Sequence, residues 1–423
     1  MKGGRLVLVD WTRGAAHAGV FAESLRGWQL ESELRLPARL AVRLEQAGDG
    51  LRVLAGEEAM TVRDDATTLI FENPARDLPR MDDAELQTLL LGGFWRALTK
   101  SLLERGLLRE GEQAAGYVVP PANSPLPMLE NFRASCASAR PLRLVGSVHE
   151  AAALVLGFLR SEAFNLEESA PASALPVTVC LVLACDEQTV DVVCFDYALQ
   201  SPKRHRILIR DCFQTTCVEL TKRLRDCDWL GLFSLLVSLE DPTLPAQSQS
   251  ALDASLQAIA SGGVDLQVRR TTAASQFKLR GGAHIALCAA GRAPDEQEYD
   301  VAHACHIGLQ IDQQHFQPIV DKDEWAQLKE FPHFAAQAFR QRGSLGNSLR
   351  LNLYSGYSTL VDDAVLLGHT MLWQEELAQL TGPTALAAAL RLDSPGSGEF
   401  LLGLMPDNRT LRQQTFTLPG LVV

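Results

Sequence analysis

Residue types that could bind a metal or act as nucleophiles occur in this chain at spacings that favour structural roles. His303, Cys305 and His306 carry metal-binding atoms close together. Neighbouring positions on a strand point to opposite faces, so three convergent ligands are hard to build there. Ser147 lies near His149, but no strained nucleophile turn accompanies the pair. We therefore predict no metal site and no catalytic nucleophile.

The nine cysteines are an odd number and include no C-x-x-C pair. This spacing does not suit a disulfide scaffold or a zinc ribbon, and Cys212 and Cys217 are most simply buried thiols. The opening MKGGRLVLVDWTRG has too short an apolar run for a signal peptide. No stretch approaches the roughly 20 apolar residues of a membrane span. We expect a cytoplasmic protein.

Length and charge narrow the class of protein. A chain of 423 residues predicts two or three domains. With 47% hydrophobic and 21% charged residues, the chain should fold. Lys and Arg total 39 against 51 Asp and Glu, a net charge of −12, which argues against nucleic acid and anionic membranes as partners.

The elements of the N-terminal part follow from its apolar spacing. Residues 5–9 form an apolar strand that ends at Asp10. Leucine and phenylalanine at helical spacing predict a helix over 82–106, and alanine-rich 148–159 predicts another. The polar, proline-bearing stretch 161–176 is predicted to be a connector.

The pattern then restarts. Strands are predicted at 177–183 and 190–195, followed by a helix over roughly 213–239. From about residue 296 short strands separated by turn residues predict a C-terminal β-sandwich. The expected fold class is α/β, in two related lobes, plus an all-β domain. The predicted domains are residues 1–160, 177–292 and 296–423.

Seven segments occur in the same order as in one known family. They are GYVVPPANSP (116–125), AAALVLGFL (151–159), VTVCLVLACDEQTVDVVCFDY (177–197), GGAHIALCAAG (281–291), CHIGLQIDQQHFQPIVDKDE (305–324), LRLNLYSGYSTLVDDAVLLGHTML (349–372) and LRLDSPGSGEFLLGLM (390–405). In this order they resemble the seventy-kilodalton heat-shock chaperones, members of the actin-like ATPase superfamily. The resemblance implies an actin-like (ribonuclease H-like) domain of two lobes, the second reduced, followed by a peptide-binding-type β-sandwich without its helical lid.

The resemblance also implies where a nucleotide would bind. The first phosphate turn would contain Asp10, Thr12 and Gly14, and the second Thr189 and Asp191. Such turns use glycine so that backbone N–H groups approach the phosphates, and an aspartate on each side to hold the metal.

Both turns depart from the family pattern. Trp11 and Arg13 stand where the family has small residues. In the second turn Ala184 replaces the aspartate, and Asp186 and Glu187 replace glycines. Two unit charges of like sign 4 Å apart repel by about 4 kcal/mol at an effective dielectric constant near 20, so these carboxylates oppose a triphosphate.

Further positions of the family's site are also lost. No lysine lies at 71–75, Val148 replaces the family's glutamate, and the segment before Gly281 is short and lacks the adenosine motif. We therefore predict a pseudo-ATPase with a vestigial site, no cofactor and no metal. Asp10 and Asp191 would then only cap turns.

In the sandwich, the resemblance implies a peptide site between two loops. Its expected residues are Leu309, Ile311, Phe316, Phe339, Arg340 and Arg342. Extended peptides dock through backbone hydrogen bonds and apolar pockets, so this binding needs no cofactor. The acidic linker 293–299 and the missing lid would remove an ATP-driven release cycle.

The favoured function is a chaperone or co-chaperone that does not hydrolyse ATP. Its partners would be unfolded or extended peptide segments, or a full-length chaperone of the same family. One alternative is an active, divergent chaperone that uses ATP and Mg²⁺, and another is an actin-like scaffold.

Overall fold

The chain is a mixed α/β protein with several separate sheets. The structure, a computed structural model, describes residues 4–11, 15–24, 27–44, 51–63, 67–81, 83–161, 177–184, 189–201, 203–226, 233–240, 246–260, 267–272, 274–292, 297–327, 332–339, 348–378, 385–394, 397–405 and 409–418. It divides into two compact units, here called unit 1 and unit 2. Unit 1 comprises the described residues of 1–207 and 214–301, and unit 2 those of 208–213 and 302–420.

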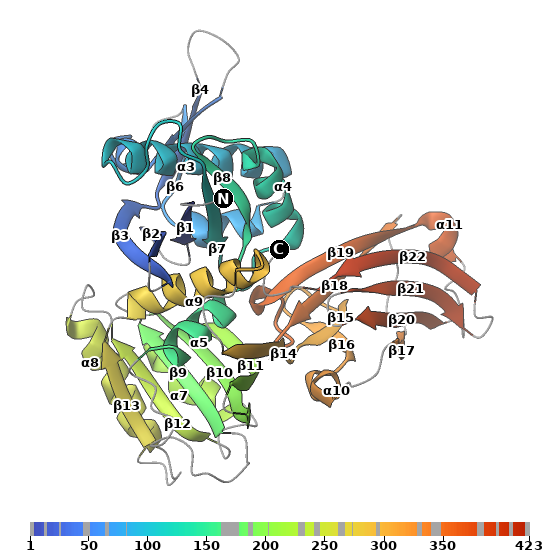
Figure 1. Ribbon diagram of the computed structural model, residues 1–423. Helices are drawn as coiled ribbons and strands as arrows, with labels where there is room; N and C mark the ends of the chain where they lie inside the picture. The colour runs from blue at the N-terminus through green and yellow to red at the C-terminus, as the bar shows by residue number, and fades with distance from the viewer. Residues whose placement is uncertain are drawn as a thin grey trace. The chain divides into compact units, whose positions relative to one another are not determined.

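Unit 1 contains a five-stranded sheet built around the first strand of the chain (Figure 1). Its strands, in spatial order, are β3 (Gly27–Pro37), β2 (Ala15–Ser24), β1 (Arg5–Asp10), β7 (Ala114–Val119) and β8 (Leu142–Ser147). β1 pairs antiparallel with β2 and parallel with β7, which pairs parallel with β8. The apolar run of β1 is buried throughout because the sheet is covered on both faces.

A second, six-stranded sheet repeats this order. Its strands are β13 (Gln267–Thr272), β12 (Phe233–Glu240), β9 (Val177–Ala184), β10 (Thr189–Ser201), β11 (Arg204–Thr216) and β14 (Glu298–His303). β9 pairs antiparallel with β10 and parallel with β12, which pairs parallel with β13. In both sheets a hairpin lies on one side of the first strand and two parallel strands lie on the other.

The remaining elements of unit 1 are helices and one small sheet. A three-stranded sheet has the order β5 (Leu51–Ala55), β4 (Leu40–Leu44), β6 (Thr68–Phe71). The helices are α1 (Glu57–Met60), α2 (Pro74–Asp77), the 3-10 turn η1 (Leu78–Arg80), α3 (Ala84–Glu104), α4 (Leu126–Cys136), α5 (Glu150–Leu159), α7 (Cys217–Asp226), α8 (Ala246–Ala260) and α9 (Ala274–Ala289). Helices α3 and α4 pack against each other beside the first sheet, where α3 contacts β4 and β5 and α4 contacts β8.

Two helices, α5 and α9, cross between the two large sheets of unit 1 (Figure 1). Glycines permit this close crossing. A Cβ on Gly157 would lie 1.9 Å from the backbone oxygen of Phe277, and one on Gly281 would lie 1.9 Å from that of Ala153. Any larger residue at either position would separate the helices.

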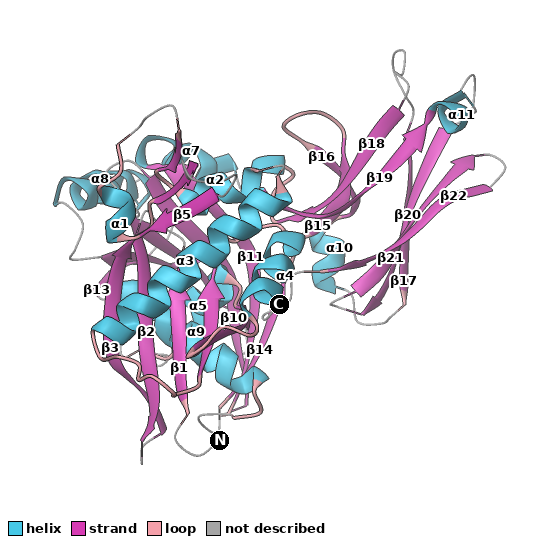
Figure 2. Cartoon of the chain, turned by 90° about the horizontal axis from the view of Figure 1, so that it is seen from above, coloured by secondary structure: helices cyan, strands magenta, loops and turns pink. Residues whose placement is uncertain are grey.

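Unit 2 is built from two four-stranded antiparallel sheets (Figure 2). One has the order β16 (Phe316–Val320), β15 (His306–Gln310), β18 (Ser348–Gly356), β19 (Ala364–Trp373). The other has the order β17 (His333–Phe339), β20 (Ala385–Ser394), β21 (Ser397–Met405), β22 (Arg409–Thr417). Short helical elements are α10 (Lys322–Gln327), η2 (Val361–Asp363) and α11 (Gln374–Leu377). The sheets meet where β16 contacts β20 and β19 contacts β22.

Most predicted elements occur, and one is wrong. The strands at 5–9, 177–183 and 190–195 and the helix at 148–159 are confirmed. The helix predicted over 213–239 is instead the end of β11, the short α7 and the strand β12. β12 is a central parallel strand buried on both faces, so its apolar run shows no alternation that would reveal a strand. The connector predicted at 161–176 lies outside the described residues, apart from Ser161.

Candidate functional site

The residues expected to hold a nucleotide lie at the ends of two hairpin strands of unit 1. Asp10 is the last residue of β1, is buried, and stands opposite His17 in the register with β2. Thr189 and Asp191 begin β10, and both are partly buried. Thr12 and Gly14 lie outside the described residues, as do Arg13, Asp186 and Glu187.

A lysine from α9 lies against the carboxylate of Asp191. The side chain of Lys278 is only 1% exposed, and its Nζ lies 3.5 Å from Asp191 Oδ2. The same Nζ donates a short hydrogen bond to Glu150 Oε1, at the first residue of α5. The other oxygen of Glu150, Oε2, accepts a hydrogen bond of 3.0 Å from the backbone N–H of Ala122. We call Lys278, Glu150 and Asp191 the ion cluster.

The ion cluster joins three elements that are distant in the sequence. α5 follows the first sheet, β10 belongs to the second, and α9 contacts β1, β2 and β7 of the first. The glycine-dependent crossing of α5 and α9 brings the ammonium within reach of both carboxylates. A buried ion pair of this kind is costly to break, because one partner would then be buried alone.

The surroundings of Glu150 favour its neutral form. Burial is the main cause that raises the pKa of this carboxyl group, the ammonium of Lys278 lowers it, and the carboxylates of Asp191 and Asp10 raise it, so that together they place this pKa at about 7. Both aspartates therefore lie close enough to Glu150 to influence its charge. The group changes its charge near neutral pH, unlike an exposed glutamate.

Sequence reasoning did not identify Glu150 or Lys278. The prediction noted that Val148 replaces the family's glutamate, but a glutamate occurs two positions later and is buried in this cluster. The available signal was a charge flanked by apolar residues. Glu150 is the one charged residue of the helix EAAALVLGFL, and Lys278 lies between Phe277 and Leu279. A charged residue is seldom buried unless it has a partner.

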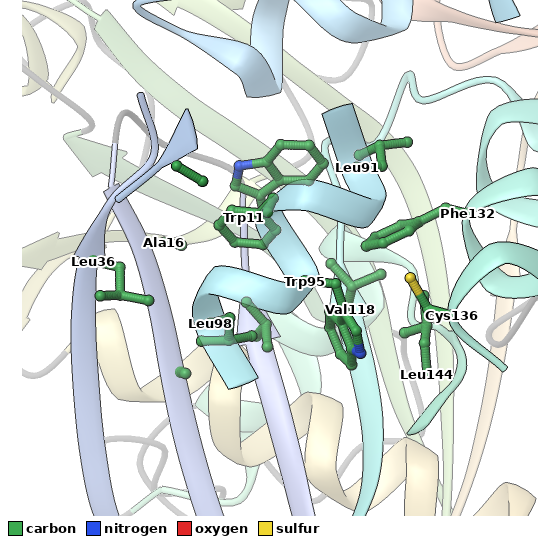
Figure 3. Close-up of a cluster of buried hydrophobic side chains, with 14 of the residues drawn as sticks. Trp11, Ala16, Leu36, Leu91, Trp95, Leu98, Val118, Phe132, Cys136 and Leu144 are labelled. Carbon is green, nitrogen blue, oxygen red and sulfur yellow. The ribbon is translucent and has the colours of Figure 1, made fainter. Parts of the chain in front are cut away.

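Trp11 does not project into the space where phosphates were expected. Its backbone N–H bonds to Val119 O at 2.9 Å, and its indole is 1% exposed. The ring stacks on Phe94 at 5.1 Å and lies 6.5 Å from the ring of Phe132, within the core of the first sheet and α3 (Figure 3). The side chain of Trp11 therefore contributes to the core.

The residues expected to bind peptide are distributed between the core and the surface of unit 2. Leu309 on β15 is 2% exposed and Phe316 on β16 is 1% exposed, so both contribute to the core. Ile311, after β15, is 56% exposed. Phe339 ends β17 and is half-buried. Arg340 and Arg342 lie outside the described residues.

The histidines and cysteine considered as metal ligands or catalytic groups lie in buried surroundings. His303 Nδ1 and the Tyr357 hydroxyl share a short hydrogen bond, and burial raises the pKa of the Cys305 thiol to about 11. Burial lowers the pKa of His149 to about 4, so this imidazole is neutral at pH 7. Within the described residues, no group of three His, Cys, Asp or Glu side chains is placed to hold a metal ion.

Comparison with known proteins adds no relative. No protein-family model matches the chain, and no curated protein sequence matches it. Among the described residues, no helix has the length and apolar character needed to cross a membrane.

Proposed function

We propose that this chain is an actin-like, chaperone-type binding protein of the cytoplasm that does not hydrolyse ATP. The repeated strand order of its two large sheets supports two actin-like lobes. The two antiparallel sheets of unit 2 support a peptide-binding-type sandwich at the C-terminal side. In this proposal the lobes no longer drive a nucleotide cycle, and unit 2 binds unfolded or extended peptide segments or a full-length chaperone.

The single observation that carries this proposal is the place of the Lys278 ammonium. An ATPase of this type needs its aspartates free to hold Mg²⁺ and the water molecules around it. Here the carboxylate of Asp191 faces a positive charge that belongs to the chain itself. Two unit charges 4 Å apart interact by about 4 kcal/mol at an effective dielectric constant near 20, and a divalent ion would meet about twice that repulsion. The ammonium therefore disfavours Mg²⁺ beside Asp191.

The proposal is tested with purified full-length protein and Mg-ATP. We expect no hydrolysis above background and no thermal shift at millimolar Mg-ATP. A ligand present at 100 times its Kd would stabilise the native state by about 2.7 kcal/mol, which is a shift of several degrees. A calorimetric Kd for ATP in the micromolar range would contradict the proposal and favour the active chaperone.

Peptide binding, the second part of the proposal, is tested separately. A panel of extended peptides, screened by fluorescence anisotropy against the same protein, should contain weak and rapidly exchanging binders. If no peptide in the panel binds, an actin-like scaffold becomes the better description.

A further inference from the structure

The described cysteines of the chain differ in how accessible their sulfur atoms are. Cys212 is partly buried, Cys288 is exposed, and the other described cysteines are buried. The buried ones are Cys136, Cys180, Cys194, Cys217 and Cys305. A thiol reacts with a dissolved reagent only where the reagent can reach it. Among these residues, Cys288 is therefore the first candidate for chemistry at sulfur.

The end of helix α9 explains why Cys288 is exposed. Gly291 follows the helix with a φ of 69°, and its N–H donates to Cys288 O at 2.9 Å. The N–H of Arg292 donates to Leu287 O at 2.8 Å, which completes a Schellman motif. The helix stops here, and Cys288 lies in its last turn with its side chain exposed.

An imidazole lies beside this thiol. Nε2 of His284 is 3.6 Å from Sγ of Cys288, one helical turn away on the same face of α9. His284 is 5% exposed, so a buried ring faces an exposed sulfur. The C-terminal end of a helix carries partial negative charge, which disfavours a thiolate. Activation of the thiol must therefore come from the imidazole, acting as a base that takes the thiol proton.

Aromatic neighbours hold the imidazole in place. The ring of Tyr299 on β14 lies edge-on to that of His284, with the two centroids 5.5 Å apart. Tyr299 also stacks on His205 of β11 at 4.8 Å, and the guanidinium of Arg160 lies 5.9 Å from the Tyr299 centroid. The Tyr299 hydroxyl donates to Gln297 Oε1 at 2.7 Å. A ring packed in this way is held in one orientation, with Nε2 toward the thiol.

We propose that Cys288, with His284 as its general base, is a modification site that takes low-molecular-weight disulfides. A disulfide requires from the protein a thiolate and a proton for the leaving sulfur, and this pair of residues supplies both. The site is in unit 1 and is independent of peptide binding by unit 2.

The reaction is a thiol–disulfide exchange. Nε2 of His284 accepts the thiol proton while Sγ of Cys288 attacks one sulfur of the disulfide. The new S–S bond forms as the old one breaks, and the departing thiolate takes the proton from the imidazolium. Cys288 is oxidised and the departing thiol is reduced, so no other oxidant is required.

The probe is oxidised glutathione, added to the reduced full-length protein at neutral pH. Intact-mass spectrometry follows the addition of one glutathionyl group, and peptide mapping identifies the cysteine that carries it. We expect modification of Cys288 before Cys212 or any buried cysteine. In urea-unfolded protein, where His284 no longer faces the thiol, Cys288 should react about tenfold more slowly at the same pH. Accessibility alone predicts the opposite order.

Two variants separate the action of the base from exposure. His284→Gln removes the base and should lower the rate at Cys288 about tenfold or more. The rate of this variant should rise about tenfold per pH unit between about pH 6 and 8, as for an ordinary thiol. The rate of the natural protein should rise less steeply. Cys212→Ser is the matched control and should leave the rate at Cys288 unchanged.

The outcomes decide the proposal in either direction. Earlier modification of another cysteine, or faster reaction of Cys288 in the unfolded chain, overturns it. An equal rate and an equal pH profile for the natural protein and His284→Gln also overturn it. If His284→Gln does not fold, the comparison of native and urea-unfolded natural protein still decides the question.

Discussion

Unit 1 contains two largely buried regions that are opposite in chemistry. The core of the first sheet is aromatic, with Trp11 and Phe94 stacked and Trp95 set edge-on to Phe132. The crossing of α5 and α9 instead holds the ion cluster. The aromatic region gains stability from the apolar area that it buries. The ion cluster adds little net stability, because the cost of burying its charges offsets their attraction. Removing one of its three residues, however, leaves another charge without its partner.

The largest effect should come from breaking the ion cluster. Lys278→Met leaves the largely buried carboxyl groups of Glu150 and Asp191 without a cation, and we expect a loss of up to about 3–5 kcal/mol in the free energy of unfolding. Calorimetric scans of the full chain would show this as a lower Tm for unit 1.

The double variant Lys278→Met with Glu150→Gln is the control. It removes one of the two stranded charges, so it should recover part of the loss. If the single variant is as stable as the natural protein, the ion cluster does not hold the crossing together.

The second largest loss of stability should come from forcing α5 and α9 apart. Gly281→Ala places a Cβ 1.9 Å from the backbone oxygen of Ala153, so the helices must separate and the ion cluster must stretch. We expect a loss of about 1–3 kcal/mol or more. Gly92→Ala in α3 is matched, because its nearest neighbour would be 3.8 Å away, and it should stabilise by about 0.5–1 kcal/mol. Equal effects of both substitutions on Tm would contradict the crossing geometry.

A smaller effect follows from the raised pKa of Glu150. Between its ordinary pKa of 4.5 and about 7, the native carboxyl keeps a proton that the unfolded chain has released. The contribution of Glu150 to the free energy of unfolding is therefore complete below about pH 4.5 and is lost as the pH rises through about 7. The free energy of unfolding changes by at most about 1.4 kcal/mol per pH unit from this group.

The measurement compares the natural protein with Glu150→Gln, which cannot titrate at this position. The difference in Tm, natural minus variant, should fall as the pH is raised from 5 to about 7. A difference that stays constant over this range would show that Glu150 keeps its ordinary pKa.

The smallest effect belongs to the aromatic core. The indole Nε1 of Trp11 is buried, and among the described residues it has no hydrogen-bond partner. Trp11→Phe leaves a small cavity but removes an unsatisfied donor, so the two changes oppose each other. We expect a loss of about 1 kcal/mol or less in urea unfolding. If Trp11→Phe lowers the free energy of unfolding as much as Lys278→Met does, the aromatic core and the ion cluster do not differ in this way.

Much of the local structure could be predicted because the apolar periodicity reports directly on burial. The strand that ends at Asp10, the helix α5 and the hairpin of β9 and β10 follow from spacing alone. β12 could not be predicted, because a strand covered on both faces and a buried helix have the same apolar composition. The peptide residues Leu309 and Phe316 were expected to be accessible, and in the structure they are buried. Which side of a hairpin faces the opposite sheet depends on residues far along the chain.

The sequence by itself determined the strand and helix periods and the negative net charge. Only the tertiary structure decided where the buried charges lie. Lys278 and Glu150 are 128 positions apart, and neither helix by itself shows which charge the other supplies. The glycine-dependent crossing of α5 and α9 brings them together. The cost of burying either charge without the other keeps them there.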